Sequence, residues 1–256
     1  MAYSPREHTV RAMILAAGFG TRLRPLTDAL PKPLLPITGR PLIVWNLLLL
    51  RRHGITDVIV NLHHLGQMIE QALGNGSQFG MRLAYSREPA ILGTGGGLKQ
   101  AEPFFGGEAF LVVNGDTLFE LDITGMVSAH REHRALATMA VRADPDPDRW
   151  GAVELDGARR VVRIVGRGKQ PEGPTEKRMF AGVHLMHPGL LASVPAGRES
   201  SIIDAYVGAI QSGETVAGFE LRGYWSDVGT PDRYAQAQRD AEEGKINLQD
   251  RLTPHV

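Results

Sequence analysis

Glycines and cationic side chains near the start of the chain are the first residues whose types could do chemistry. Gly18 and Gly20 lack a Cβ, so their backbone N–H groups can approach an anion closely. Arg22 and Arg24 follow, and the donor fork of a guanidinium group suits phosphate oxygens. Lys32 stands between two prolines, on a stiff stretch of backbone. The pattern indicates a phosphate-binding loop after a strand, with a tight turn as the alternative explanation of the glycines.

Two common phosphate motifs do not fit this loop. The dinucleotide fingerprint requires a third glycine where this chain has Leu23. A P-loop requires Gly-Lys-Ser/Thr after its first glycine, and that run is missing. A phosphate-binding loop at this position therefore follows neither of these two patterns.

A carboxylate follows a later apolar run and is a candidate metal ligand. Residues 110–113 predict a buried strand, and Asn114, Gly115 and Asp116 come directly after it. In open parallel sheets, ligands bind beyond the carboxyl ends of the strands. Mg²⁺ takes one or two carboxylates, while phosphates and waters complete its shell. Asp116 is thus a candidate magnesium ligand, with an ordinary turn aspartate as the alternative.

A run of small residues, 93–97, predicts a second loop pressed against a ligand, ahead of a helix at 98–104. A flexible turn is the alternative. The histidines at 63 and 64 are adjacent, so they would not share a helix face as metal ligands do. We interpret these two, and His184 with His187, as packing or surface residues.

The elements that must position these groups alternate along the chain, which predicts an α/β protein with a doubly wound, mostly parallel sheet. Pro231 is expected to open the last helix, with Thr230 as its N-cap. The first ten residues and the last ten are interpreted as a leader and a tail. The predicted strands are 12–17, 55–60, 82–87, 110–113, 137–143, 150–155, 161–165, 180–185 and 215–221; the predicted helices lie between Pro41 and Gly54 and at 65–73, 98–104, 123–133 and 200–211.

Composition narrows the class of protein. The 256 residues and 43% hydrophobic content suit one large α/β domain. Lys+Arg and Asp+Glu are both 28, and this zero net charge argues against a nucleic-acid or membrane-surface partner. There is no cysteine, which excludes disulfides and thiolate sites. Without a signal peptide or a membrane-length apolar run, we expect a soluble cytoplasmic protein with small-molecule partners, as a monomer or a homo-oligomer.

The run Leu15 to Thr27, with Pro31-Lys32-Pro33, resembles the signature of the sugar-1-phosphate nucleotidyltransferases. The likeness extends over about residues 11–241 and includes a Trp-x-Asp-x-Gly-Thr-Pro run at 225–231. It implies a Rossmann-like, doubly wound, mixed and mostly parallel sheet with a small sugar-binding β subregion, the GT-A-like nucleotidyltransferase fold. It also implies a single domain over 1–256, with a nucleotide-binding half (11–135), a sugar-phosphate-binding half (136–230) and a C-terminal helix and tail (231–256).

The resemblance also implies roles for individual residues and a Mg²⁺ cofactor. The implied catalytic cations are Arg22 and Lys32, and the implied metal ligands are Asp116 and Asp227. The implied nucleotide contacts are Leu15, Ala16, Ala17, Gly18, Gly20, Thr21, Arg22, Glu88, Gly93 and Thr94, and the implied sugar-phosphate contacts are Asn114, Gly151, Arg167 and Phe180.

This chain departs from the family pattern in two places. The family has a Glu-Lys-Pro motif whose lysine grips the sugar phosphate, and here Gly166-Arg167 stands in its place. Arg167 keeps the charge, Lys169 is a second candidate, and the segment 166–174 is interpreted either as a mobile loop or as a fixed grip. Gly95 occupies a position where alanine is common in the family.

The expected reaction joins a nucleoside triphosphate to a hexose 1-phosphate, giving an NDP-sugar and pyrophosphate. The sugar phosphate is already an anion, so no general base is needed. Glu88 could accept two hydrogen bonds from guanine but only one from uracil or thymine, which favours GTP with mannose- or heptose-1-phosphate. The alternatives are UTP or dTTP with glucose-1-phosphate or N-acetylmuramate-1-phosphate, and a regulatory relative that binds these ligands without turnover.

Overall fold

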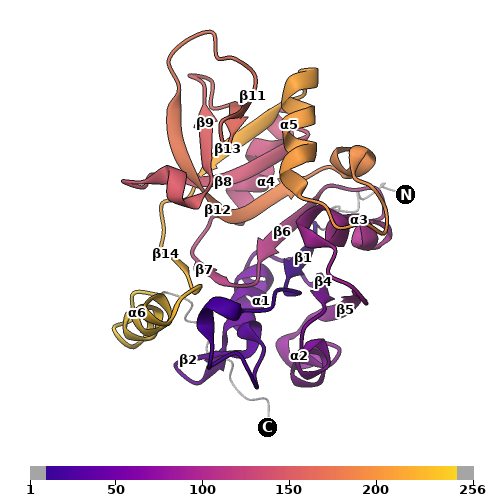
Figure 1. Ribbon diagram of the computed structural model, residues 1–256, viewed down its shortest axis with the longest axis vertical. Helices are drawn as coiled ribbons and strands as arrows, with labels where there is room; N and C mark the ends of the chain where they lie inside the picture. Colours follow the sequence, from indigo (N-terminus) through magenta and orange to yellow (C-terminus); the bar gives the residue numbers. More distant parts are fainter. Residues whose placement is uncertain (1–9, 247–256) are drawn as a thin grey trace, which may run out of the picture.

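The computed structural model describes residues 10–246, so the predicted tail and nearly all of the predicted leader lie outside the described residues. Its centre is a parallel sheet in the strand order β6-β1-β4-β5, as Figure 1 shows. Consecutive residues of β1 enter different cores: Ala12 and Ile14 pack with α1 and α2, whereas Met13 packs with α3. This alternation is why an apolar run such as 12–15 forms a strand buried on both faces. The elements here are β1 Arg11–Leu15, α1 Leu42–Arg52, β4 Asp57–Leu62, α2 Gly66–Leu73, β5 Arg82–Arg87, α3 Gly93–Phe105 and β6 Phe110–Asn114.

A second, largely antiparallel half continues the same sheet beyond β6. The long strand β12 pairs with β6 at one end and with β9 at the other, while β8 pairs with both β12 and β13. A bulge at Gly182, whose φ is +79°, separates the two stretches of β12. This half contains β8 Ala137–Arg142, β9 Ala152–Leu155, β10 Val161–Ile164, β11 Arg167–Gly168, β12 Glu176–Met186, α5 Ile202–Ser212 and β13 Val216–Glu220.

Helices cover both faces, and small elements tie the halves together. Helices α1, α2, α4 and α6 contribute side chains to one core, and α3 and α5 contribute to the other. In the two-stranded sheet β14-β7, the segment just before α6 pairs with the segment just after β6. The predicted cap of α6 is confirmed, because the Thr230 side chain accepts from the N–H of Arg233. The remaining elements are β2 Pro36–Ile37, β3 Arg40–Pro41, β7 Thr117–Phe119, α4 Ile123–Glu132, β14 Trp225–Asp227 and α6 Pro231–Glu242, with short 3-10 helices at Thr21–Leu23, Lys32–Leu34, Ser77–Phe79, Pro147–Trp150 and Pro188–Ser193.

The predicted fold class is confirmed: the central sheet is mixed and mostly parallel, with helices on both sides. One local prediction is wrong, and another is only partly met. The glycine-rich run 93–97 is not a loop but the beginning of α3. The segment from Gly166 is not simply a loop either, because Arg167–Gly168 forms β11 and pairs with β10. Val165 and Gly166, with φ of +51° and +70°, make the two-residue turn between these strands.

Between residues 10 and 246, the structure contains no helix with the length and apolar character needed to cross a bilayer.

Candidate active site

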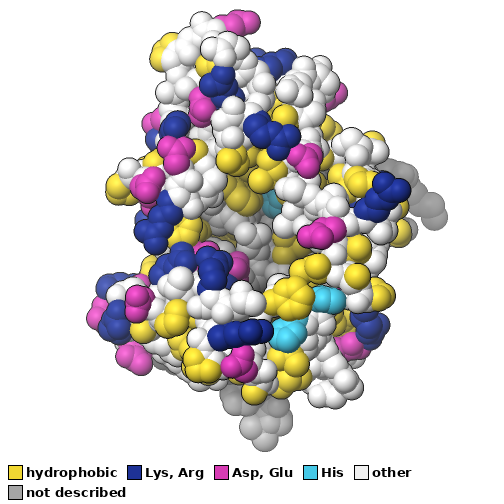
Figure 2. All heavy atoms as spheres, in the orientation of Figure 1, with side chains coloured by type: hydrophobic (Ala, Val, Ile, Leu, Met, Phe, Trp, Pro, Cys, Tyr) yellow, Lys and Arg dark blue, Asp and Glu magenta, His cyan; other side chains and the backbone are white. Residues whose placement is uncertain are grey.

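A cleft of about 450 Å³ lies at the carboxyl ends of β1, β4, β5 and β6. Figure 2 shows a hollow between the two halves, with Lys and Arg side chains gathered along one edge. The position agrees with the general rule for open α/β sheets. Many of the residues predicted from the sequence line this cleft: Leu15, Ala16, Ala17, Gly18, Gly20, Thr21, Arg22, Lys32, Glu88, Gly93, Thr94, Asn114 and Asp116.

The loop after β1 is fixed at Gly20, which has a φ of +66°. A Cβ at this position would lie 3.1 Å from Cγ2 of Thr27 and 3.3 Å from Cβ of Lys32. The buried Thr27 donates its hydroxyl to the Gly20 carbonyl at 2.8 Å. Glycine is therefore required both by the left-handed backbone and by the close approach of two side chains.

The backbone N–H groups of Gly18, Phe19 and Gly20 have no hydrogen-bond partner among residues 10–246. They line the cleft together with Arg22. Free N–H groups on successive residues form a concave site for an anion. The loop thus has the donors that the sequence predicted for binding phosphate.

Lys32 and Asp116 meet on one wall of the cleft. The Lys32 side chain is nearly buried, and its Nζ donates to Oδ2 of Asp116 at 2.7 Å. Prolines 31 and 33 hold the short helix that carries the lysine. Two residues 84 positions apart in sequence are therefore in direct contact, and the cation lies beside the candidate metal ligand.

Asp227 is brought to the same place by the small β14-β7 sheet. It stands opposite Thr117 in the register, and the next N–H, that of Val228, donates to the carbonyl of Asp116 at 2.9 Å. Burial, and then the Asp116 carboxylate, raise the pKa of Asp227 above its usual value, while Lys32 and two arginines oppose the rise. The register and the Val228–Asp116 hydrogen bond place the two aspartates next to each other across the β14-β7 sheet.

Arg22, Asp227 and Arg233 crowd around Gly229, which also lines the cleft. A Cβ at Gly229 would lie 2.2 Å from Oδ1 of Asp227. It would also lie 3.1 Å from Nη2 of Arg233 and 3.2 Å from Nη2 of Arg22, which are close contacts. The same Oδ1 forms an ion pair with Nη1 of Arg233 at 3.2 Å, but it accepts no hydrogen bond. Arg22 is thus held beside the second carboxylate.

The two carboxylates fit a hard divalent cation. Oδ1 of Asp227 is buried and lacks a hydrogen-bond partner, so a cation would satisfy it. In the described part of the chain, no group of three or more His, Cys, Asp or Glu side chains is arranged to hold a metal ion. Two carboxylates with phosphate and water ligands are the usual set for Mg²⁺.

The Glu88 carboxylate, which the guanine interpretation requires to face the base, lines the cleft but already accepts hydrogen bonds within the protein. Its Oε1 accepts from Nδ2 of Asn61 at 2.7 Å, and its Oε2 accepts from the N–H of Leu92 at 2.9 Å. Asn61 in turn accepts from the N–H of Ala16 at 2.7 Å through Oδ1. The buried Glu88 therefore ties β4, the loop after β1 and the start of α3 together, which weakens the sequence-based reason for preferring guanine.

Three predicted sugar-phosphate residues are not among the residues that line the cleft. Gly151 ends a short 3-10 helix, and the Phe180 ring packs edge-on to His184 at 5.4 Å. Arg167 is exposed in β11 and donates to Asp204 of α5 at 2.9 Å. Their roles remain predictions.

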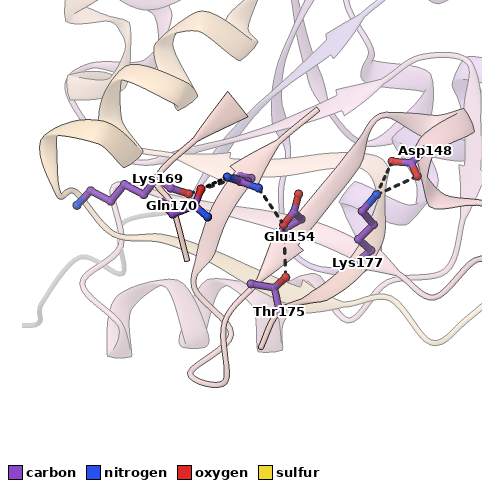
Figure 3. A network of polar contacts seen from close by, with 7 residues as sticks. Asp148, Glu154, Lys169, Gln170, Thr175 and Lys177 are labelled. Atoms are coloured by element: carbon purple, nitrogen blue, oxygen red, sulfur yellow. Dashed lines mark hydrogen bonds and ion pairs between the residues drawn. The ribbon is translucent and has the colours of Figure 1, made fainter. Parts of the chain in front are cut away.

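Lys169, the second candidate for the sugar phosphate, lines a separate depression with Gly213. Figure 3 shows its side chain extending away from the polar network of the second half, in which Thr175 donates to Glu154 and Lys177 pairs with Asp148. This placement gives Lys169 no position in the cleft.

The structure adds residues that the sequence analysis missed. Phe19 and Asn61 line the cleft. Arg233 contacts Asp227. A Cβ at Gly182, in the β12 bulge, would lie 3.1 Å from Nδ2 of Asn114. The position of Asn61 directly at the end of a predicted strand was a signal. No pattern marked Arg233, which contacts Asp227 from the first turn of α6.

Known proteins resemble this chain over most of its length. A family model described as nucleotidyl transferase matches residues 11–244. The chain is 40% identical over 234 residues to the N-acetylmuramate alpha-1-phosphate uridylyltransferase of Neisseria meningitidis serogroup B, covering 90% of this chain and 97% of that protein. It is 32% identical over 239 residues to the mannose-1-phosphate guanylyltransferase of Mycobacterium tuberculosis, covering 93% of this chain but 66% of that protein.

A solved structure shows the same architecture. It is that of a Bacillus anthracis protein described as a glucose-1-phosphate thymidylyltransferase, in complex with sucrose. The TM-score is 0.79 at 26% identity, with 91% of this chain and 96% of the other covered. The three similar proteins are thus named for three different nucleobases.

Proposed function

This chain belongs to the nucleotidyl transferase family, as an enzyme of the sugar-1-phosphate nucleotidyltransferases, and we propose that it transfers a uridylyl group from UTP to N-acetylmuramate α-1-phosphate. The observation that carries the choice of substrates is the similarity to the Neisseria uridylyltransferase, which this chain matches over nearly that protein's whole length. The sequence had favoured GTP through Glu88, but both oxygens of that carboxylate have partners within the protein.

The proposed reaction exchanges one phosphoanhydride bond for another. An oxygen of the sugar phosphate attacks the α-phosphorus of UTP, and the bond between the α-phosphorus and the bridging oxygen to the β-phosphate breaks. Pyrophosphate leaves with that oxygen and its electron pair. Because the attacking oxygen is already anionic, no side chain has to remove a proton.

The protein's contribution is to bring two anions together and to stabilise the charge on the leaving group. The free N–H groups of residues 18–20 would bind the triphosphate, and Arg22 and Lys32 would stabilise the pyrophosphate as it leaves. We propose that residues 11–135 hold the nucleotide and residues 136–230 the sugar phosphate. Gly151, Arg167 and Phe180 are proposed contacts for the latter.

Asp116 and Asp227 would hold Mg²⁺, which when bound neutralises phosphate charge and fixes phosphate oxygens in place. Both carboxylates face cations of the protein in its absence, Lys32 and Arg233. These pairs would hold the carboxylates in position and limit the cost of burying two like charges.

A panel of substrates tests the proposal. UTP, dTTP and GTP are each combined with N-acetylmuramate α-1-phosphate, glucose-1-phosphate and mannose-1-phosphate, and pyrophosphate release is measured with saturating Mg²⁺. We expect the highest kcat/KM for UTP with N-acetylmuramate α-1-phosphate. A preference for GTP with mannose-1-phosphate would restore the sequence-based choice, and no release from any pair would show a binding protein without turnover.

Replacing Asp116 tests the metal site. In Asp116→Asn, one of the two carboxylates loses its charge while the size of the side chain is kept, so kcat for pyrophosphate release should fall on the order of 100-fold or more at saturating Mg²⁺. Lys177→Ala, which removes an exposed ion pair with Asp148 outside the cleft, is the matched control and should keep normal turnover. Normal turnover by Asp116→Asn would remove Asp116 from the metal site.

A further inference from the structure

Phe19 is an exposed aromatic side chain on the wall of the cleft. Among residues 10–246, the strongly exposed large hydrophobic side chains are Phe19, Leu26 and Val165, at 43%, 44% and 51%. Of these three, Phe19 alone lines the cleft. An exposed ring at a concave site is a typical feature of ligand binding, because an apolar ligand surface can cover it.

The ring rests on two histidines that follow β4. Its centroid lies 5.4 Å from that of His63, edge to face, and 5.5 Å from that of His64. His63 is itself fixed, since its Nδ1 lies 2.8 Å from the carbonyl oxygen of Glu88. Figure 2 shows histidine side chains against a hydrophobic group at the edge of the hollow. The histidines therefore support one side of the ring and leave the remainder uncovered.

The strand order indicates whether Phe19 would contact the nucleoside or the phosphates of a bound nucleotide. In the order β6-β1-β4-β5, β4 and β6 flank β1 on opposite sides. The histidines that support Phe19 follow β4, whereas Asp116, the partner of Lys32, follows β6. A triphosphate held by Lys32 and by a cation at Asp116 would thus point its nucleoside toward the β4 side of the cleft.

We propose that the Phe19 ring stacks on the nucleoside of bound UTP, with His63 and His64 as the support behind it. This inference rests on the proposed function, because it takes a nucleoside triphosphate as the ligand. Stacking on an aromatic ring is tolerant of the base, so Phe19 supplies affinity for the nucleoside end, and the choice among bases comes from other residues.

The test separates the nucleoside from the phosphates. Binding of UTP and of tripolyphosphate, each with Mg²⁺, is measured by calorimetry for the unmodified protein, Phe19→Ala, Phe19→Trp and Leu26→Ala. Phe19→Ala should weaken UTP binding on the order of tenfold and leave tripolyphosphate binding unchanged, since only UTP carries a base. Phe19→Trp should restore UTP binding, and Leu26→Ala, an equally exposed residue of the same segment outside the cleft lining, should bind both ligands normally.

Turnover gives a second readout. A contact made equally in the ground state and the transition state should raise KM for UTP and leave kcat nearly unchanged in Phe19→Ala. Equal UTP affinity in Phe19→Ala and the unmodified protein, or an equal loss of UTP and tripolyphosphate binding, would overturn the inference and leave the proposed function standing. If the unmodified protein bound no nucleoside triphosphate, the proposed function would fall as well.

Discussion

At the scale of single residues, the site depends on a missing methyl group as much as on charged side chains. Gly229 follows Asp227 by two positions, and the Asp227 carboxylate and the guanidinium groups of Arg22 and Arg233 fill the space where its Cβ would stand. The backbone there needs no positive φ, so the glycine is explained by this close approach. The position of the second candidate metal ligand is therefore set partly by its neighbour.

Gly229→Ala should damage catalysis more than stability. A Cβ 2.2 Å from Oδ1 of Asp227 must push that carboxylate aside, and misplacing a reacting or charge-holding group by about 1 Å can cost on the order of 100-fold in rate. We expect that loss in kcat for pyrophosphate release. Gly157→Ala, in the open β9–β10 turn with no atom within 4 Å of the new Cβ, is the control and should turn over normally. Unchanged kcat in Gly229→Ala would show that the carboxylate is free to move without consequence.

His184 should make stability depend on pH. It is fully buried in β12 with Nδ1 2.6 Å from the Tyr206 hydroxyl, and burial lowers its pKa to about 3. The unfolded chain binds a proton at this histidine below about pH 6.5, whereas the folded chain does not, so its contribution is present above that pH and is lost as the pH falls toward 3. Between pH 7 and pH 5 the loss should be about 2 kcal/mol in the free energy of unfolding.

Denaturant unfolding at both pH values checks this expectation in the unmodified protein and in His184→Gln. The variant should be less stable at pH 7 but should lose less stability on acidification. His130, whose pKa burial lowers to about 4, remains in both proteins and cancels in the comparison. Equal losses in the two proteins would mean that His184 is not the titrating group.

Residue types predicted the cations and carboxylates of the cleft well, because their chemistry is visible in the sequence. Lys32 contacts Asp116, and Asp227 lies next to Asp116 across the β14-β7 sheet, although only a resemblance to a family marked Asp227 beforehand. Glu88 shows where residue type fails. A carboxylate in a loop after a strand could face a ligand or its own protein, and only the fold shows that Asn61 and Leu92 take both of its oxygens.

At the scale of elements, the beginning of α3 is the clearest case of tertiary packing overriding local propensity. Residues 93–97 have poor helix propensity and were predicted as a loop. The chain just before α5 lies against them: Gly95 donates to the carbonyl of Ser200 at 2.8 Å, and Thr94 accepts from the N–H of Ile202 at 3.1 Å. Glycine is needed because a side chain would block this approach, and a Cβ at Gly95 would lie 2.8 Å from Oγ of Ser200. The same contact explains why the alanine common in the family is not found here.

Gly96→Ala should therefore destabilise the protein, against the usual effect of alanine in a helix. The new Cβ would lie 2.3 Å from the backbone carbonyl oxygen of Arg198, and such overpacking typically costs about 1–3 kcal/mol. Gly208→Ala in α5, where no atom lies within 4 Å of the new Cβ, should instead gain up to about 1 kcal/mol. Thermal unfolding of both variants measures the contrast. A gain in Tm for Gly96→Ala would show that the segment before α5 moves away freely.

The turn between β10 and β11 stands at the position where the family has a sequence motif. Where the family has Glu-Lys, Gly166 takes a left-handed conformation in a tight hairpin turn, and Arg167 pairs with α5 through Asp204. A β-branched residue such as Val165 is unusual at the first position of such a turn, so no local pattern predicted the hairpin.

At the scale of the whole molecule, the site is assembled where the two halves of the sheet meet. The cationic loop follows β1, Asp116 follows β6, and Asp227 returns from beyond the second half through β14. The β12 bulge contributes as well, since the Ala181 carbonyl accepts from Nε1 of Trp225 at 2.9 Å in β14. The periodicity of the sequence predicted the parallel half, but contacts between segments more than 100 residues apart leave no local pattern to predict from.

This assembly implies that Mg²⁺ and UTP should stabilise the fold together and only weakly alone. Mg²⁺ alone would have two carboxylate ligands, which already pair with Lys32 and Arg233, and the described residues offer no third acidic ligand. A triphosphate would supply further oxygen ligands to the metal and would pair with the two displaced cations. At a hundredfold excess over Kd, the bound pair should add about 2.7 kcal/mol to the free energy of unfolding. Thermal unfolding with Mg²⁺, with UTP plus EDTA, and with both measures the three cases. The rise in Tm with both should exceed the sum of the separate rises, and Asp116→Asn should lose this excess while keeping the small effect of UTP alone. The expectation would be contradicted if Mg²⁺ alone raised Tm as much as Mg²⁺ with UTP, or if EDTA did not reduce the rise in Tm that UTP causes. Mg²⁺ and UTP would then not bind together at this cleft.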